Sequence, residues 1–225
     1  MQSYTIPEPV RQRVLRRQGR LFSHDTIDPK RAALVVVDMQ NYFVATGHPG
    51  EVPAARGIVG NVNRMASAMR SAGGAVIWVQ TTATGALEHW ANHHRHMLTP
   101  ERAAKRLAAL ADGSASCQLY PELEARPGDI YVKKIKYSAL VRDSSDLEEV
   151  LRRRRAESVI IAGTTTNVCC ESTARDAMLL DFRVIVLSDA TAASSVEEHA
   201  ASLTNIQLYF GDVMTVDEAL ERLSS

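Results

Sequence analysis

The sequence predicts a single α/β domain built on an open parallel β-sheet with helices on both faces. The chain has 225 residues, a length that suits one large domain, because division into two would halve the apolar core of each. Continuous apolar runs without polar alternation recur along the chain and are typical of strands buried on both faces. Helical patterns separate these runs, and alternation of this kind builds right-handed βαβ units.

The expected elements follow a polar, arginine-rich arm at residues 1–31, and the domain occupies residues 32–225. The first apolar run, Ala32-Ala-Leu-Val-Val-Val-Asp38, ends in a carboxylate. The other expected strands lie at residues 75–80, 129–133, 158–163, 183–188 and 212–216. The expected helices lie at residues 54–72, 100–111, 145–155, 169–181, 196–208 and 216–223. Residues 81–100 have the least regular pattern and are expected to form a loop over the site.

Composition excludes several classes of protein. The chain has 26 Lys+Arg, 26 Asp+Glu and zero net charge, so no overall field attracts nucleic acid or an anionic membrane. No apolar stretch reaches the ~18 residues of a membrane span. The three cysteines form no Cys-x-x-Cys pair, which disfavours a disulfide scaffold and a thiolate zinc site. We therefore expect a cytoplasmic protein without nucleic-acid or membrane partners, in which the arm forms a solvated or subunit-clasping helix.

Ligands of open α/β sheets bind beyond the carboxyl ends of the strands, and two cysteines follow one of these ends. Cys170 belongs to a small, mostly apolar helical stripe suited to packing on the sheet. This stripe comprises Cys170, Thr173, Ala174, Ala177 and Met178. Cys169 lies off the stripe at the expected helix N-terminus, where backbone N–H groups and the helix dipole favour a thiolate. Cys169 is therefore a candidate nucleophile, with a purely structural thiol as the alternative.

A carboxylate and several ammonium groups close two other expected strands. Asp38 could act as a general base tuned by burial and a nearby cation, or could cap a helix or pair with a distant arginine. The cation could come from Lys133, Lys134 or Lys136; alternation places Lys134 and Lys136 on one face and does not choose between them. Thiol, carboxylate and ammonium together indicate nucleophilic catalysis with an acid/base partner.

Metal and nucleotide sites have little support in the sequence. Four of the seven histidines lie in His89-Trp-Ala-Asn-His93-His94-Arg-His96, without the spacing of a zinc motif. A solvated or interface segment is favoured there, and no metal is expected. The turn that begins at Gly163 lacks the further glycines of a dinucleotide fingerprint.

Three segments resemble the motifs of the isochorismatase-like cysteine hydrolases. They are residues 35–43 (VVVDMQNYF), 134–140 (KIKYSAL) and 163–177 (GTTTNVCCESTARDA). The motifs occur in the order of the family, the resemblance covers about residues 28–218, and the third segment is most similar to the ureidoacrylate amidohydrolase branch. The resemblance implies a Rossmann-like, three-layer α/β/α sandwich with a six-stranded, mostly parallel sheet.

The resemblance also assigns site residues. It implies a catalytic triad of Asp38, Lys134 and Cys169, and thereby selects Lys134 over Lys136. It implies a cis peptide bond between Thr164 and Thr165, and an oxyanion hole formed by the backbone N–H groups of Thr165 and Cys169. It requires no metal and no organic cofactor. Weaker candidates for binding the substrate are Gln40, Asn41, Gln80 and Tyr137, of which the first two could instead be capping groups.

The implied activity is cysteine-dependent hydrolysis of a linear C–N bond in a small amide or ureide through a thioester, with a ureidoacrylate-like compound as the first candidate substrate. Alternatives are another C–N hydrolase of the superfamily, acting on a biuret, N-carbamoyl or maleamate-type substrate, and a catalytically idle binding protein with this fold. The presence of Cys169 disfavours cleavage of a vinyl ether. Only His48 stands near the end of the first motif, which disfavours nicotinamide as the substrate. Leu140 stands where relatives often have Phe, which would reshape the pocket. Relatives are commonly dimers or tetramers, so a homo-oligomer is expected.

Overall fold

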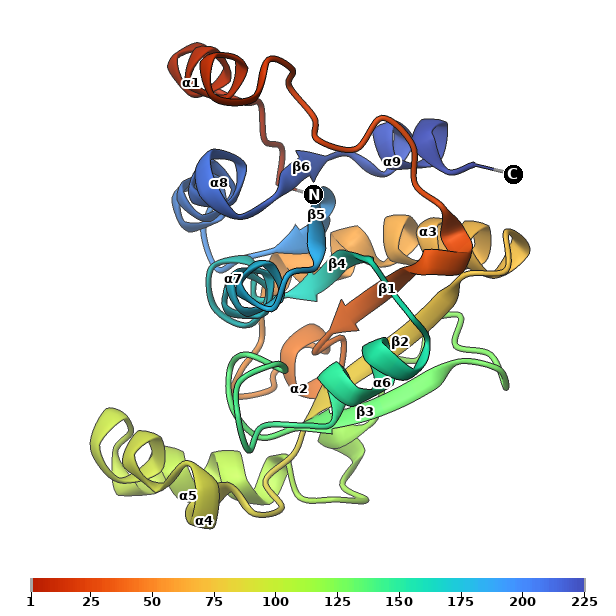
Figure 1. The fold of residues 1–225 in the computed structure, drawn as a ribbon. Helices are drawn as coiled ribbons and strands as arrows, with labels where there is room; N and C mark the ends of the chain where they lie inside the picture. The colour runs from red at the N-terminus through yellow and green to blue at the C-terminus, as the bar shows by residue number, and fades with distance from the viewer. Residues whose placement is uncertain (1, 225) are drawn as a thin grey trace.

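Six strands form one sheet in the order β3-β2-β1-β4-β5-β6 (Figure 1). The computed structural model describes residues 2–224, so the outermost residues of the predicted arm and domain, 1 and 225, lie outside the described residues. The strands are β1 (Ala32–Val37), β2 (Ala75–Thr81), β3 (Ile130–Lys134), β4 (Ser158–Thr164), β5 (Arg183–Ala192) and β6 (Asp212–Met214). Every neighbouring pair is parallel, which confirms the predicted α/β fold class.

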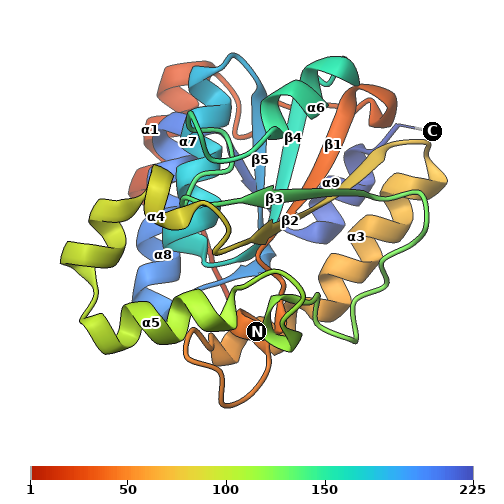
Figure 2. The same cartoon turned by 90° about the horizontal axis from the view of Figure 1, so that it is seen from below.

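Helices cover both faces of the sheet and complete three layers (Figure 2). The helices are α1 (Glu8–Gln18), α2 (Asn41–Val44), α3 (Val59–Ser71), α4 (Ala86–His89), α5 (Pro100–Ala109), α6 (Leu147–Arg153), α7 (Glu171–Leu179), α8 (Val196–Asn205) and α9 (Val216–Arg222). Helices α3 and α9 share a core with Leu34 and Val36 of β1, whereas α6, α7 and α8 share a core with Val35 and Val37. Successive side chains of β1 therefore enter opposite layers, which explains its uninterrupted apolar sequence.

Two capping boxes define where the last helices begin. The hydroxyls of Ser195 and Thr215 accept hydrogen bonds from the N–H groups of Glu198 and Glu218. The two glutamate side chains accept in turn from the backbone N–H groups of the capping residues. These reciprocal bonds satisfy N–H groups that the first turn of a helix leaves free.

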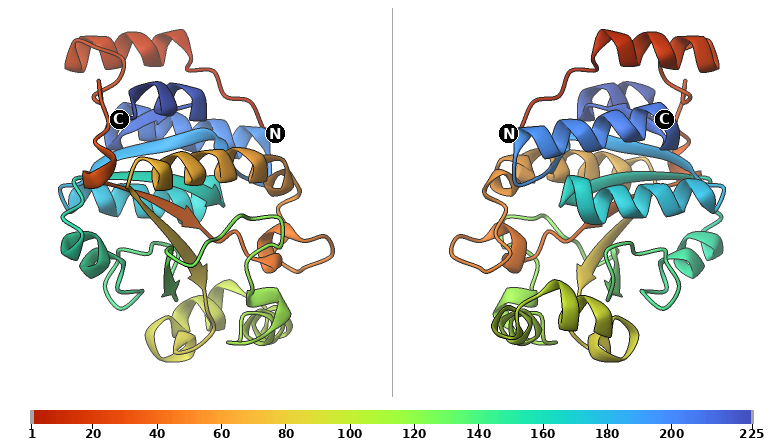
Figure 3. Two further views of the ribbon diagram at one scale, coloured as in Figure 1. Left: turned by 90° about the vertical axis from the view of Figure 1, so that its right-hand side faces the viewer. Right: turned by 90° about the vertical axis from the view of Figure 1, so that its left-hand side faces the viewer.

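The N-terminal arm packs along the domain (Figure 3). Val10 and Val14 of α1 are buried against Leu208, so the apolar stripe of the arm faces its own chain rather than solvent. Farther along, the carboxylate of Asp212 accepts hydrogen bonds from the backbone N–H groups of Ser23 and His24. The same carboxylate lies 2.7 Å from Nδ1 of His24, and both side chains are buried.

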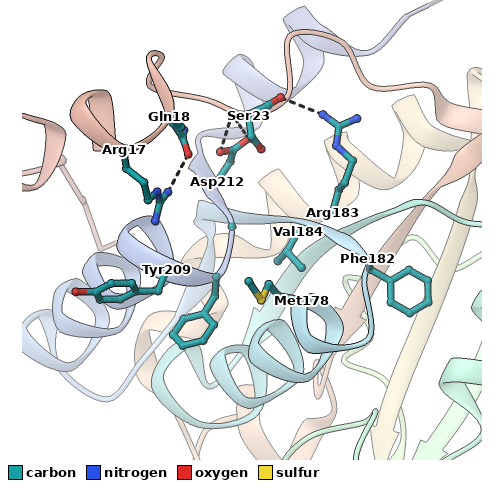
Figure 4. A pocket seen from close by; sticks show the side chains of 11 residues that line it. Arg17, Gln18, Ser23, Met178, Phe182, Arg183, Val184, Tyr209 and Asp212 are labelled. Carbon is teal, nitrogen blue, oxygen red and sulfur yellow. Dashed lines mark hydrogen bonds between the residues drawn. The ribbon is translucent and has the colours of Figure 1, made fainter. Parts of the chain in front are cut away.

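The structure corrects several sequence-based expectations about elements. Strand β5 continues to Ala192, and the predicted loop at residues 81–100 contains α4 and a π-helical turn at His93–Met97. Met178, predicted on the buried stripe of α7, is 42% exposed and lines a groove beside the arm (Figure 4). Helical geometry places it about 80° around the axis from Cys170, at the margin of the stripe. The other stripe residues are buried.

No helix within residues 2–224 combines the length and the apolar character that crossing a membrane requires.

Candidate active site

The candidate catalytic residues lie at the carboxyl edge of the sheet, where the strand order reverses direction. Strands β2 and β3 follow on one side of β1, and β4, β5 and β6 extend from the other side. Asp38 directly follows β1, and the turn that carries Cys169 directly follows β4. Adjacent strand ends that diverge in this way leave a crevice, which is where open α/β sheets bind ligands.

Gly163 allows these two strand ends to approach each other. Its φ is +110°, and a Cβ at this position would lie 2.0 Å from the carbonyl oxygen of Val37. Thr164, the next residue, donates a hydrogen bond from its hydroxyl to the carbonyl oxygen of Asp38, at 2.9 Å. Any side chain at position 163 would therefore displace the nucleophile turn from Asp38.

Asp38 and Lys134 form a fully buried ion pair. Nζ of Lys134 lies 2.8 Å from Oδ2 of Asp38, and the side chains are 1% and 0% exposed. Thr81, at the end of β2 between them, donates to Oδ1 of Asp38 from its hydroxyl (2.8 Å) and its N–H (3.0 Å) and accepts from Nζ of Lys134 (2.7 Å). Burial is the largest single effect and lowers the pKa of Lys134, but the charge of Asp38, the adjacent Cys169 and the hydrogen bond to Asp38 together outweigh burial and raise that pKa above its usual value.

Cys169 completes the cluster as a neutral thiol. Its Sγ lies 3.5 Å from Nζ of Lys134, and the residue is 5% exposed. Burial raises the pKa of Cys169 to about 12, although the charge of Lys134 acts in the opposite direction; the charge of Asp38 and a hydrogen bond to it add to the increase. The expectation of a resting thiolate is therefore wrong, because burial outweighs the nearby positive charge. The proton of the thiol has an acceptor in Asp38.

The other two cysteines have structural surroundings. Cys170 is fully buried on the sheet side of α7, and burial raises its pKa well above the usual value. Cys117 is buried beside Gln40, whose side-chain amide donates to its carbonyl oxygen at 2.9 Å. Burial raises the pKa of Cys117 as well. The structure thus places Cys169, and neither of the others, against Lys134.

The nucleophile turn is a π-helical turn at Thr166–Cys170, preceded by a cis peptide bond between Thr164 and Thr165. The carbonyl oxygen of Thr165 accepts hydrogen bonds from the N–H groups of Val168 and Cys170, the two residues that flank Cys169. These two hydrogen bonds hold the backbone of Thr165 next to the segment that carries Cys169.

Helix α8 holds the start of this turn through two hydrogen bonds. The hydroxyl of Ser202 donates to the carbonyl oxygen of Thr166 at 3.2 Å, and the hydroxyl of Thr166 is hydrogen-bonded to Nδ1 of His199 at 2.9 Å. All three side chains are buried. Burial lowers the pKa of His199, so its imidazole is neutral near pH 7.

A pocket of about 190 Å³ is lined in part by residues that follow the ends of β1 and β3, the strands that position Asp38 and Lys134. Aromatic side chains and the basic residues of α5 line it; they include Tyr42, Phe43, His93, Arg106 and Tyr137. Burial raises the pKa of Tyr137, which is also influenced by the charges of Arg106, Cys169 and Lys134. Tyr137 is thus close both to the thiol and to the pocket, and it is the one predicted substrate-binding residue in the pocket wall.

The other three predicted substrate-binding residues have structural contacts instead. Gln40 donates to the carbonyl oxygens of Thr81 and Cys117 and accepts from the N–H of Thr81. Gln80 also donates to the carbonyl oxygen of Cys117, and Asn41 donates to that of Ala115. These amides connect the strand ends to residues 115–117, so their polar groups are engaged by backbone. The connection spans segments far apart in the sequence, which motif reasoning could not detect.

The histidine-rich segment, expected to be solvated or to lie at an interface, is partly buried within its own chain at His93 and His94. The rings of His93 and Trp90 stack with centroids 4.0 Å apart, and Tyr137 packs edge-on against Trp90 at 4.7 Å. Burial, together with the charges of Arg106 and His94, lowers the pKa of His93 to about 4. Within residues 2–224, no three His, Cys, Asp or Glu side chains are grouped so as to hold a metal ion.

Three residues of the site were missed by sequence reasoning. Thr81 follows the predicted end of a strand by one residue, and its register opposite Lys134 could have suggested it. His199 and Arg106 lie on helices remote from the motifs, and no local pattern distinguishes them from other helix residues.

Fold and site together define an α/β protein with a buried Asp–Lys–Cys cluster at the switch point of its sheet. Residues 32–218 match the isochorismatase domain. The chain therefore belongs to the isochorismatase family, whose relatives include cysteine hydrolases.

Solved structures of similar proteins agree with this assignment. A cysteine hydrolase from Pseudomonas syringae pv. phaseolicola is 31% identical, with a TM-score of 0.78 over 87% of this chain and 93% of that chain. An isochorismatase family protein from Burkholderia thailandensis is 28% identical, with a TM-score of 0.71 over 90% and 100% of the two chains. N-carbamoylsarcosine amidase from Thermoplasma acidophilum, at 24% identity, shares the fold with a TM-score of 0.64 over 83% and 97%.

Proposed function

We propose that the protein is a cysteine-dependent amidohydrolase that cleaves a linear C–N bond in a small amide or ureide. The observation that carries this proposal is the buried contact of Lys134 with both Asp38, at 2.8 Å, and Cys169, at 3.5 Å. A thiol, a proton acceptor and a fixed cation are the groups that acyl transfer through a thioester requires. A ureidoacrylate-like compound is one substrate within this class; biuret, N-carbamoyl and maleamate-type compounds are others.

The proposed reaction begins with the neutral thiol. Asp38 accepts the proton of Cys169 as Sγ forms a bond to the substrate carbonyl carbon, and Lys134 stabilises the developing negative charge on sulfur. The backbone N–H groups of Thr165 and Cys169 stabilise the oxyanion. The C–N bond then breaks, and Asp38 returns the proton to the leaving nitrogen, which departs as ammonia or an amine. Water, deprotonated by Asp38, hydrolyses the thioester and restores the thiol.

The first test measures ammonia release from a panel of small amides and ureides by the wild type and by Cys169→Ala and Cys169→Ser. Both variants should lose at least about a thousandfold in kcat/KM, because the nucleophile is absent or poorly matched to the site. Circular dichroism should show an unchanged fold, since the side chain is small.

Cys170→Ala is the matched control for this experiment. Its thiol lies one residue away but packs on the sheet, so most activity should remain. Comparable activity of the wild type and Cys169→Ala would refute the proposed mechanism. A wild type that releases no ammonia from any compound would instead favour a binding protein with this fold.

A further inference from the structure

The pocket lined by Tyr137 contains a positive charge without a counter-charge. Arg106 is half-buried on α5, and its guanidinium lies 5.6 Å from the ring centroid of Tyr42. In the described part of the chain, this guanidinium forms neither an ion pair nor a hydrogen bond. Its neighbour Lys105, by contrast, is exposed and paired with Glu101 at 2.7 Å. A partly desolvated cation that lacks a partner is unfavourable until an anion binds to it.

Arg106 is close enough to act on the reacting groups. Its charge has a lowering effect on the pKa values of Lys134, Tyr137 and Cys169, in addition to the larger effects of burial. Tyr137 follows Lys134 by three residues and lines the same pocket as Arg106, so a ligand attacked by Cys169 would reach Arg106 past Tyr137. His93, on the same wall, has a pKa lowered to about 4, chiefly by burial, so it is neutral near pH 7.

The remaining wall defines the body of such a ligand. Tyr42, Phe43 and Leu98 supply apolar and aromatic surface, and the exposed Arg102 adds further positive charge to the lining. The volume of about 190 Å³ is below the range of roughly 300–1,000 Å³ that is typical of drug-sized ligands. The pocket thus suits a short molecule with a small apolar or planar body and one anionic end.

We infer that the substrate is a small amide or ureide whose end remote from the scissile bond carries a carboxylate, bound by Arg106. The inference rests on the proposed function and makes Arg106 the residue that determines specificity. A guanidinium suits this task because its parallel N–H groups bind both oxygens of a carboxylate. The ring of Tyr42 orients the guanidinium without neutralising it.

The test uses pairs of compounds that differ only in charge. Each pair consists of a monoamide of a short dicarboxylic acid, or an ω-ureido acid, and the analogue in which a methyl ketone replaces the carboxylate. For the wild type, kcat/KM from ammonia release should be at least about tenfold higher for the acid than for the ketone. Arg106→Gln should reduce this ratio to near one, mainly by raising KM for the acid. Arg106→Lys should restore part of the preference.

Arg153→Gln is the matched control, because Arg153 is an exposed arginine of α6, paired with Glu149 at 3.3 Å. It should leave the ratio unchanged. Equal kcat/KM for acids and ketones in the wild type would overturn the inference while leaving the proposed function intact. Absence of ammonia release from every compound would contradict the proposed function instead. Calorimetry with Cys169→Ala protein then decides the inference separately: equal affinity for acids and ketones would overturn it.

Discussion

The buried charges of Asp38 and Lys134 stabilise each other. Removal of either charge alone therefore lowers the free energy of unfolding. Both side chains are essentially inaccessible to water, so a single remaining charge would be desolvated and unpaired. Asp38 has a φ of +54°, a backbone conformation that Asn also tolerates. Position 38 therefore accepts Asn without backbone strain, and an amide oxygen there can still accept the hydrogen bonds of Thr81.

Lys134→Met should lower the free energy of unfolding by about 3–5 kcal/mol and abolish ammonia release, because it leaves the carboxylate of Asp38 buried without a counter-ion. Urea denaturation followed by circular dichroism measures the change. The double variant Asp38→Asn/Lys134→Met should recover much of the stability while remaining inactive, because it removes both charges. If Lys134→Met were as stable as the wild type, the claim that the ion pair stabilises the fold would be wrong.

At the scale of elements, α8 acts on the nucleophile turn without touching the thiol. Ser202 and His199 project from this helix and hold the carbonyl and hydroxyl groups of Thr166, three residues before Cys169. The capping box at Ser195 defines the start of α8 and hence which of its residues face the turn. Displacement of the turn should therefore affect catalysis more than folding.

Ser202→Ala and Ser188→Ala form a matched pair that tests this role. Both serines are buried and donate to a backbone carbonyl, Ser202 to Thr166 at 3.2 Å and Ser188 to Met214 at 3.3 Å. Each variant should lose about 1 kcal/mol in the free energy of unfolding. Only Ser202→Ala should lower kcat, with KM nearly unchanged, because only its acceptor belongs to the nucleophile turn. Equal kcat values for the two variants would show that α8 has no positioning role.

At the scale of the whole molecule, the arm and the last strand are joined through Asp212. Burial would raise the pKa of this carboxyl, but hydrogen bonds from His24 and from the N–H group of Ser23 outweigh burial and lower it. A lowered folded-state pKa means that the ionised form stabilises the fold above the ordinary carboxyl pKa of about 4. This stabilisation is lost as the pH falls through the folded-state pKa.

Asp212→Asn should therefore lower the free energy of unfolding by about 2 kcal/mol at pH 7, with a difference from the wild type that shrinks below about pH 4. Urea denaturation between pH 3 and pH 8 measures this dependence, and limited proteolysis detects release of the arm. Asp25→Asn is the control, because its side chain is 74% exposed and its ion pair with Arg20 is screened by water. A difference that stays constant with pH would exclude Asp212 as the titrating group.

The sequence by itself determined the alternation of strands and helices, and it separated Cys169 from Cys170. Both results follow from periodicity, which records whether a residue faces the core along a single strand or helix. The resemblance to the family motifs added Lys134, which alternation alone could not distinguish from Lys136. Periodicity and motifs are properties of short segments of the chain, so they can be recognised before any long-range contact is known.

Only the tertiary structure decided which groups from distant parts of the sequence lie in contact and which protonation state they have. The strand order places Thr81 between Asp38 and Lys134, engages Gln40 and Gln80 with the backbone of Cys117, and leaves Arg106 unpaired beside the pocket. Burial, which depends on the complete packing, makes Cys169 a neutral thiol rather than the thiolate expected from its position at a helix start. The physical reason is that electrostatic and solvation energies depend on all surrounding atoms, whereas sequence patterns report only neighbours along the chain.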